Sequence, residues 1–350
     1  MFLHNLKIAF RNVRKYKKQT LISLFSLSIG FVCFSLSMLW IRYEMNFDGF
    51  HKNAKQMYVV YTASTLSQTG FDRLTPTPLA AYLKETFPEI ANATPLELIT
   101  YFGGRGTVTV ENDKFPAVTI TVDSSFLRMF DVRILAGSKE FLIPGSNKFA
   151  ITLKKARQLF GNESPIGKAV NDGANEICAV VSEMPGHSNY SFDFMRAFRP
   201  QNPEFAWRST GSHTIIELHP GIDFEAFEKK LYEHETGEGR NSFTRNMKIK
   251  PLIKIRLTDP VIERDVKFQH ILIFALSGLL VVLCSLFNYL TLFVSRFRIR
   301  QKEFALRMVC GASGRSLLAM LSVEFILILL FAVVFGCVLT QLMHKLFFAL

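Results

Sequence analysis

The segment ILIFALSGLLVVLCSLFNYLTLFVSRFRIRQKEFALRMVCGASGRS, residues 271–316, decides the fold of this chain. Its first part, Ile271–Ser295, carries no charge, whereas the part that follows contains six basic side chains and one acid. An apolar run longer than about 18 residues predicts a membrane-spanning helix, and another such run begins at Leu317. The segment therefore predicts two membrane helices joined by a short, strongly positive loop.

A further uncharged run, Thr20–Ile41, predicts another span near the N-terminus. The alternative, a cleaved signal peptide, is disfavoured because the apolar core is too long and no small-residue cleavage site follows it. The predicted fold class is thus a membrane protein with three α-helical spans and a large α+β extracytoplasmic domain inserted between spans 1 and 2. The predicted boundaries are 1–19 for a cytoplasmic amphipathic helix, 20–41, 270–295 and 317–343 for the spans, 42–269 for the extracytoplasmic domain, 296–316 for a cytoplasmic segment and 344–350 for an extracytoplasmic end.

The net charge of +12 is concentrated beside the predicted spans. Residues 1–19 carry +6 and the 296–316 loop carries +5, whereas the region between the first two spans carries only +1. Positive flanks stay in the cytoplasm, so the N-terminus and the loop are predicted inside and the middle region outside. The pattern predicts a multi-pass protein of the inner (plasma) membrane, and it argues against nucleic acid as a partner because the middle region is nearly neutral.

Residues 2–18 predict an amphipathic helix that lies along the inner leaflet, which makes membrane lipid a partner. The alternative is a solvated basic tail. The helical reading rests on an apolar face opposite the basic side chains, formed by Phe2, Leu3, Leu6, Ala9, Phe10, Val13 and Tyr16.

The middle region alternates between strand-like and helix-like segments, which favours an α+β domain. The 198–212 stretch is the best linker candidate within it. Cys178 is the one cysteine of this region, so the domain is expected to fold without an internal disulfide. The segments predict strands at 56–62, 107–110, 117–122, 149–152, 177–181, 213–218 and 247–257, and helices at 78–87, 124–130, 153–160 and 224–235.

The chain offers no convincing catalytic or cofactor motif. Five residues separate Gly161 from Gly167, where a phosphate loop has four, and Ala169 stands where a hydroxyl would bind Mg²⁺. His234 lies among acidic residues but without the H-E-x-x-H spacing of a zinc site. We therefore expect no cofactor and no metal, and we do not expect the chain to be an enzyme.

Two polar side chains, Glu324 and Asn288, fall within predicted spans. A polar group in a span is costly and usually faces protein or water. For Glu324 a proton relay is one alternative, but a hydrogen bond between helices or a contact toward Arg315 is favoured. Ser26 and Gly30 form a small-xxx-small pair that suits close helix packing.

The loop sequence KEFALRMVCGAS, residues 302–313, predicts a short cytoplasmic helix of its own. Gly311 is expected to end this helix in a left-handed conformation, and Ser313 or Ser316 to cap the next helix. The alternative is a loop whose positive charge only fixes the orientation of the spans in the membrane. The predicted apolar side comprises Phe304, Leu306, Met308 and Val309, and the polar side Arg300, Lys302, Glu303 and Arg307.

This loop resembles the E-[IF]-[GA]-[IL]-R-[KR]-[VA]-[LH]-G-A-[ST] signature of MacB/FtsX-type ABC transporter permeases. RYEMNFDGFHKNAKQMYVV resembles the start of the long form found in Bacteroidetes-like genomes, and PTPLAAYLKETFPEI, VDSSFLRMFDVRILAG and AITLKKARQLFGNESPIGKAV resemble successive blocks of the MacB-like periplasmic core domain. Family members have four or more spans, so the resemblance implies an N-terminal portion of a longer permease or a truncated member. The residues in register with the signature are Glu303, Arg307, Gly311, Ala312 and Ser313.

The resemblance implies a permease subunit that transmits ATP-driven motion to its periplasmic domain, for export or for activation of an envelope partner. ATP hydrolysis would occur in a separate cytoplasmic ABC ATPase. A homo- or pseudo-dimer of permease halves and a periplasmic adaptor are further implied partners. The alternative is a membrane-anchored sensor of extracytoplasmic ligands, which would usually carry a cytoplasmic output domain. The residues implied at the ATPase contact are Lys302, Glu303, Arg307, Gly311, Ala312 and Ser313.

Overall fold

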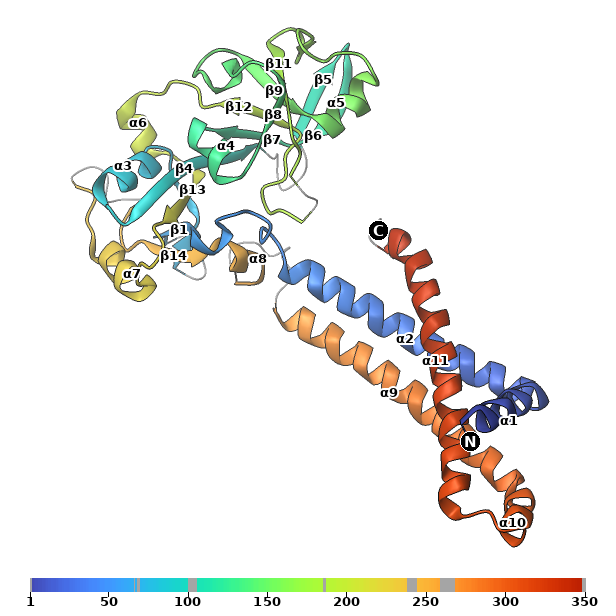
Figure 1. The fold of residues 1–350 in the computed structure, drawn as a ribbon. Helices are drawn as coiled ribbons and strands as arrows, with labels where there is room; N and C mark the ends of the chain where they lie inside the picture. The colour runs from blue at the N-terminus through green and yellow to red at the C-terminus, as the bar shows by residue number, and fades with distance from the viewer. Residues whose placement is uncertain are drawn as a thin grey trace. The chain divides into compact units, whose positions relative to one another are not determined.

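The computed structural model describes residues 2–65, 67, 70–99, 106–184, 187–237, 244–258 and 268–347. The chain divides into two compact units (Figure 1). The helical unit comprises residues 1–43 and 268–350, and the α/β unit comprises residues 44–267. Each unit has buried hydrophobic clusters of its own.

Three long helices in the described part of the chain are apolar enough to cross a membrane. The three predicted spans are thereby confirmed as helices. In hydrocarbon a helix is favoured because it satisfies all of its own backbone hydrogen bonds. The helices that form the helical unit are α1 (Phe2–Lys15), α2 (Lys17–Met45), α9 (Phe268–Ile299), α10 (Gln301–Val309) and α11 (Gly314–Phe347).

Small and polar residues bring α2 and α9 into contact, as the small-xxx-small pair predicted. A Cβ atom on Gly30 would overlap the Ser285 hydroxyl, and a Cβ atom on Gly278 would lie 2.8 Å from Oγ of Ser37. Interfaces between membrane helices favour such residues because they allow the backbones to approach closely.

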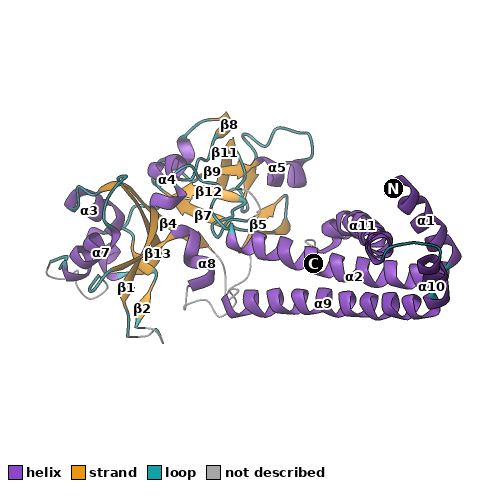
Figure 2. Cartoon of the chain, turned by 60° about the horizontal axis from the view of Figure 1, so that its bottom comes forward, coloured by secondary structure: helices purple, strands orange, loops and turns teal. Residues whose placement is uncertain are grey.

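A single mixed sheet organises the α/β unit (Figures 1 and 2). Its main path runs β10-β11-β9-β12-β7-β4-β13-β1-β14, with β2, β3 and β8 paired beside it, and β5 and β6 form a separate hairpin. The strands are β1 (Met57–Ala63), β2 (Phe71–Asp72), β3 (Leu74–Pro76), β4 (Ile90–Ile99), β5 (Gly106–Val110), β6 (Asp113–Ala117), β7 (Thr119–Val122), β8 (Ile134–Gly137), β9 (Lys148–Thr152), β10 (Ala169–Val170), β11 (Asn175–Val181), β12 (Phe194–Ala197), β13 (Thr210–Leu218) and β14 (Lys248–Pro251).

Helices pack on both faces of this sheet. Successive side chains of a strand point to opposite faces, so neighbouring residues of one strand contact different helices. In β1, Val59 belongs to the hydrophobic cluster that contains Phe126 of α4, whereas Val60 belongs to the cluster that contains Leu83 of α3 and Leu231 of α7. The helices of this unit are α3 (Leu79–Thr86), α4 (Ser124–Met129), α5 (Leu153–Phe160), α6 (Pro203–Arg208), α7 (Phe224–Glu233) and α8 (Ile255–Thr258).

Most predicted elements of the middle region are present, but several observed strands, among them β8 and β12, were not predicted. The strand predicted at 247–257 ends at Pro251 and gives way to helical turns. The long strand β4 was not predicted, and Pro95 lies inside it. The 198–212 linker candidate contains α6 and the start of β13, and β13 pairs with β4 in the middle of the sheet.

His213 of β13 is a titratable group fully enclosed in the α/β unit. Burial, helped by the positive charge of Arg73, lowers the pKa of His213 from 6.5 to about 3. The imidazole is therefore neutral at physiological pH and makes the stability of this unit sensitive to acid.

Candidate functional site

The candidate site is a buried cluster of charged side chains around the junction of α9 and α10. Arg300 occupies the N-cap position of α10, directly after α9. Its Nη1 donates to Oε2 of Glu324 in α11 at 3.1 Å, and its Nε donates to Oε2 of Glu303 at 3.2 Å. One guanidinium thus bridges two carboxylates on different helices.

Glu324 is the centre of this cluster. Its Oε2 also accepts a hydrogen bond from Nδ2 of Asn12 in α1 at 3.1 Å. The side chains of Glu324 and Arg300 are 3% and 4% exposed, so this is a buried ion pair. A buried carboxylate requires such pairing, because an unpaired charge away from water is very costly. The helix-packing alternative for Glu324 is confirmed, whereas the predicted contact toward Arg315 is wrong.

Glu303 and Arg307 form the ion pair that their i,i+4 spacing allows. Nη2 of Arg307 lies 2.8 Å from Oε1 of Glu303. Partial burial alone would raise the pKa of Glu303, but hydrogen bonds and charge attraction from Arg300 and Arg307 outweigh burial and lower it. Glu303 therefore stays ionised and extends the charged cluster along α10.

A second buried guanidinium lies one turn before Arg300. Arg296 is 4% exposed, and its Nη2 donates to Oγ of Ser23 in α2 at 3.2 Å. Nε of Arg296 and Nη2 of Arg300 have no partner among the described residues. The cluster thus contains three arginines, Arg296, Arg300 and Arg307, and two carboxylates. Through Ser23 it also includes α2 among the helices that it connects. Sequence reasoning missed Arg296, Asn12 and Ser23, because their partners lie on other helices.

The short helix α10 exposes apolar side chains and turns charged ones inward. Phe304 is buried against Ile8 and Met320, and its ring stacks on that of Phe297. In contrast, Leu306 and Val309 are 67% and 86% exposed. The prediction that Phe304, Leu306, Met308 and Val309 share one side, opposite Arg300, Lys302, Glu303 and Arg307, is therefore wrong. The exposed side chains Lys302, Leu306, Met308 and Val309 are called the outer face of α10.

The predicted signals at the end of α10 are confirmed. Gly311 has φ +94°, and its N–H donates to the carbonyl of Met308 at 3.0 Å. The N–H of Ala312 donates to the carbonyl of Arg307 at 2.9 Å, which completes a Schellman motif. Oγ of Ser313 accepts from the N–H of Ser316 at the start of α11. The turn between α10 and α11 is thus fixed by backbone geometry.

Asn288 is the other predicted polar residue of the spans, and no hydrogen bond among the described residues joins it to the charged cluster. Its Nδ2 donates to Oγ of Ser26 at 2.9 Å and links α9 to α2. No group of three or more His, Cys, Asp or Glu side chains that could hold a metal exists in the described part of the chain. The cluster can hold helices together electrostatically.

The fold and the charged cluster define a membrane protein in which an α/β domain is inserted between the first two apolar helices. A family model described as the MacB-like periplasmic core domain matches residues 20–233. The chain therefore belongs to the family of ABC-type permeases that carry this domain, and it is a protein of the inner membrane. A search of curated proteins finds no significant match.

Several solved structures are similar to this chain. A domain of a permease protein from Porphyromonas gingivalis is 19% identical, with a TM-score of 0.47, and the match covers 63% of this chain and 98% of that one. The periplasmic region of MacB from Actinobacillus actinomycetemcomitans is 14% identical, with a TM-score of 0.42, over 58% and 92% of the two chains. The extracellular domain of the noncanonic ABC-type transporter YknZ from Gram-positive bacteria is 14% identical, with a TM-score of 0.41, over 55% and 99%.

Proposed function

We propose that this permease transmits motion from a separate cytoplasmic ABC ATPase, which hydrolyses ATP, to its extracytoplasmic domain. The single observation that carries the proposal is the buried Arg300–Glu324 pair, which ties α10 to α11 and, through Asn12, to α1. A helix held in this way cannot move alone. The transmitted motion would serve export or activation of an envelope partner, with a periplasmic adaptor as a further candidate partner.

The outer face of α10 is the proposed docking surface for the ATPase. Leu306, Met308 and Val309 present apolar side chains on a nine-residue helix, with Lys302 beside them. Removal of apolar surface from water is the main favourable term in most protein–protein association. Gly311, Ala312 and Ser313 would shape the edge of this surface.

Glu303 and Arg307 would act on the inner side of α10. Their mutual ion pair and the bond from Glu303 to Arg300 connect the docking surface to the buried cluster. A displacement of α10 would be carried to α11, because separating Arg300 from Glu324 leaves the buried Glu324 carboxylate without its charged partner. Movement of the helices together is the cheaper response.

The proposed orientation places the N-terminus and residues 296–316 in the cytoplasm and the α/β unit outside. It is supported by the concentration of positive charge at these two segments. The ATPase could then reach α10 and the exported domain could reach its partner.

We further propose that the permease works as a homo- or pseudo-dimer of permease halves through α9. Apolar residues recur on α9 at alternating spacings of three and four, and all of them are exposed. This spacing produces a straight seam along a helix that packs against another at a shallow angle. The seam comprises Ile273, Leu276, Leu280, Leu283, Phe287, Leu290 and Val294.

The test is to purify the permease with its cognate ABC ATPase, and to measure both binding and stimulated ATP hydrolysis. Val309→Asp should abolish co-purification, because it places a charge at the most exposed apolar residue of the outer face. Arg300→Gln should retain binding and lose the stimulation, because it breaks transmission behind the surface. Leu135→Asp in β8 is the matched control, since Leu135 is 50% exposed in the other unit. Wild-type binding and stimulation in both test variants would refute the proposal.

A further inference from the structure

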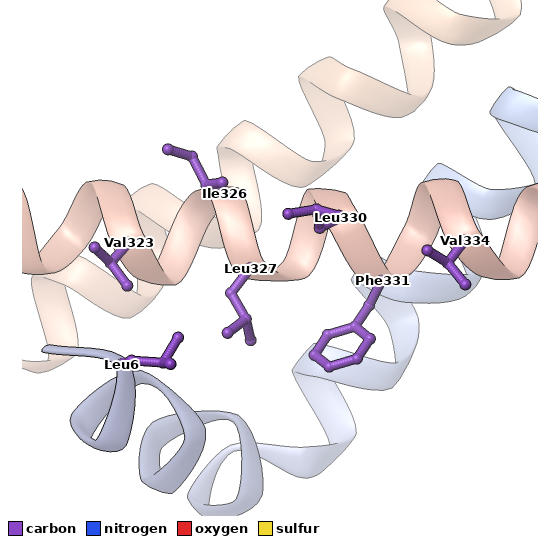
Figure 3. Close-up of a pocket in the computed structure, with 7 residues that line it drawn as sticks. All are labelled: Leu6, Val323, Ile326, Leu327, Leu330, Phe331 and Val334. Carbon is purple, nitrogen blue, oxygen red and sulfur yellow. The ribbon is translucent and has the colours of Figure 1, made fainter. Parts of the chain in front are cut away.

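An apolar groove of about 340 Å³ lies between α1 and α11 in the helical unit (Figure 3). Figure 3 shows Leu6 of α1 opposite Val323 and Leu327 of α11, with Phe331 and Val334 further along the same helix. Every side chain that lines the groove is a hydrocarbon or an aromatic ring. A hydrocarbon chain is therefore the ligand chemistry that the groove fits.

The position of α1 restricts what can fill the groove. With 14 residues α1 is about 21 Å long, too short to cross a hydrocarbon core of about 30 Å. It is amphipathic, and its Ile8, Ala9 and Asn12 are buried. Such a helix lies at the boundary between headgroups and acyl chains. Leu6 then borders the groove at the depth where an acyl chain begins.

The other side of α1 is strongly basic. Lys7, Arg11 and Arg14 are exposed, and residues 1–18 contain no acid. None of these three side chains forms an ion pair within the described part of the chain. A helix presents residues three and four apart on neighbouring positions of one surface, so Lys7, Arg11 and Arg14 form a continuous cationic strip beside Leu6.

We propose that α1 and α11 form a binding site for an anionic phospholipid, with an acyl chain in the groove and the phosphate headgroup on the strip of Lys7, Arg11 and Arg14. Charge complementarity selects this occupant over a zwitterionic lipid, because the strip has no carboxylate to neutralise it. The bound lipid would press α1 against α11. Since Asn12 of α1 donates to Glu324 of α11, the lipid would also stabilise the charged cluster.

The test is native mass spectrometry of the full-length protein, purified in detergent and supplied with equal amounts of phosphatidylglycerol and phosphatidylcholine. The wild type should retain phosphatidylglycerol with roughly tenfold or greater preference, given three basic residues near a headgroup. Leu327→Trp should reduce retention of both lipids by filling the groove. The triple variant Lys7→Gln, Arg11→Gln, Arg14→Gln should lose the preference, and because it alters only exposed side chains it should fold normally.

Two matched controls distinguish a built site from general attraction. Leu279→Trp adds the same bulk to an exposed position of α9, and Arg298→Gln, Lys302→Gln, Arg315→Gln removes three exposed charges elsewhere. Both controls should retain lipid as the wild type does. Equal retention of the two lipids by the wild type, or equal loss in a control and its test variant, would overturn the proposal. So would a disulfide between two copies of Leu330→Cys, because it would assign the groove to a second chain.

Discussion

Breaking the Arg300–Glu324 pair from one side should destabilise the helical unit, and replacing both partners should restore its stability. Glu324→Leu leaves Arg300 buried but still bonded to Glu303 at 3.2 Å. Arg300→Met leaves a buried carboxylate with only the neutral donor Asn12. Removal of one partner of a buried pair costs about 3–5 kcal/mol. We therefore expect a loss of about 3 kcal/mol for Glu324→Leu and a larger one for Arg300→Met.

The double variant Arg300→Met, Glu324→Leu should lie within about 1 kcal/mol of the wild type, because apolar side chains of similar volume replace a buried pair at little cost. Unfolding in mixed SDS micelles can measure this, with the fluorescence of Trp40 as the signal in a Trp207→Phe background. Trp40 suits the purpose because its ring lies 4.8 Å from that of Phe274 in the helical unit.

The double variant also separates stability from function. If the pair only holds the fold, the double variant should regain ATPase stimulation together with stability. We expect it to regain stability alone, because the apolar pair no longer joins Glu303 of α10 to α11. The reasoning would be refuted if the stability lost in the double variant equalled the sum of the stabilities lost in the two single variants. Such additivity would show that the two side chains are not coupled.

Gly311→Ala should destabilise the helical unit by about 1 kcal/mol and Gly311→Val by more, as thermal melts can show, because both force a side chain into φ +94°. Impermeant thiol reagents applied to intact cells should label a cysteine at position 140 but not one at 301, and the reverse would contradict the proposed orientation. The α/β unit should lose up to about 1.4 kcal/mol of stability per pH unit as pH falls from 6.5 toward 3, because its unfolded state binds a proton that folded His213, with its pKa of about 3, does not. His213→Leu should flatten this dependence, and an unchanged slope would exclude His213 as its cause.

The spans and the turn after α10 were predictable from sequence because their causes are local. An uncharged run such as Ile271–Ser295 is helical wherever it meets hydrocarbon, and Gly311 ends a helix through its own backbone freedom. The turn between β5 and β6 is local in the same way, because Glu111 and Asn112 both have positive φ, although β6 itself was not among the predicted strands. In these cases nearby residues decide the conformation.

The charged cluster was not predictable, because its partners come from distant segments. Glu324 pairs with Arg300 at the end of the preceding membrane helix and with Asn12, 312 positions away. Sequence distance favoured Arg315, which lies on the same helix. The two sides of α10 were misassigned for a related reason. Hydrophobicity alone grouped Leu306 and Val309 with Phe304 on one side, whereas ion pairs hold Glu303 and Arg307 toward the bundle. The strand β4 was missed because Pro95 is unusual inside a strand.

The most direct test of the account is photo-crosslinking from the outer face of α10 in cells. A photoreactive amino acid at position 309, where Val309 is 86% exposed, should capture the proposed ABC ATPase partner. The same amino acid at position 304 should not, because Phe304 is buried. Capture of the ATPase from position 309 alone is the predicted result. Absence of capture from position 309, with the ATPase captured elsewhere on the cytoplasmic segments, would contradict the assignment of α10 as the surface that receives the motion.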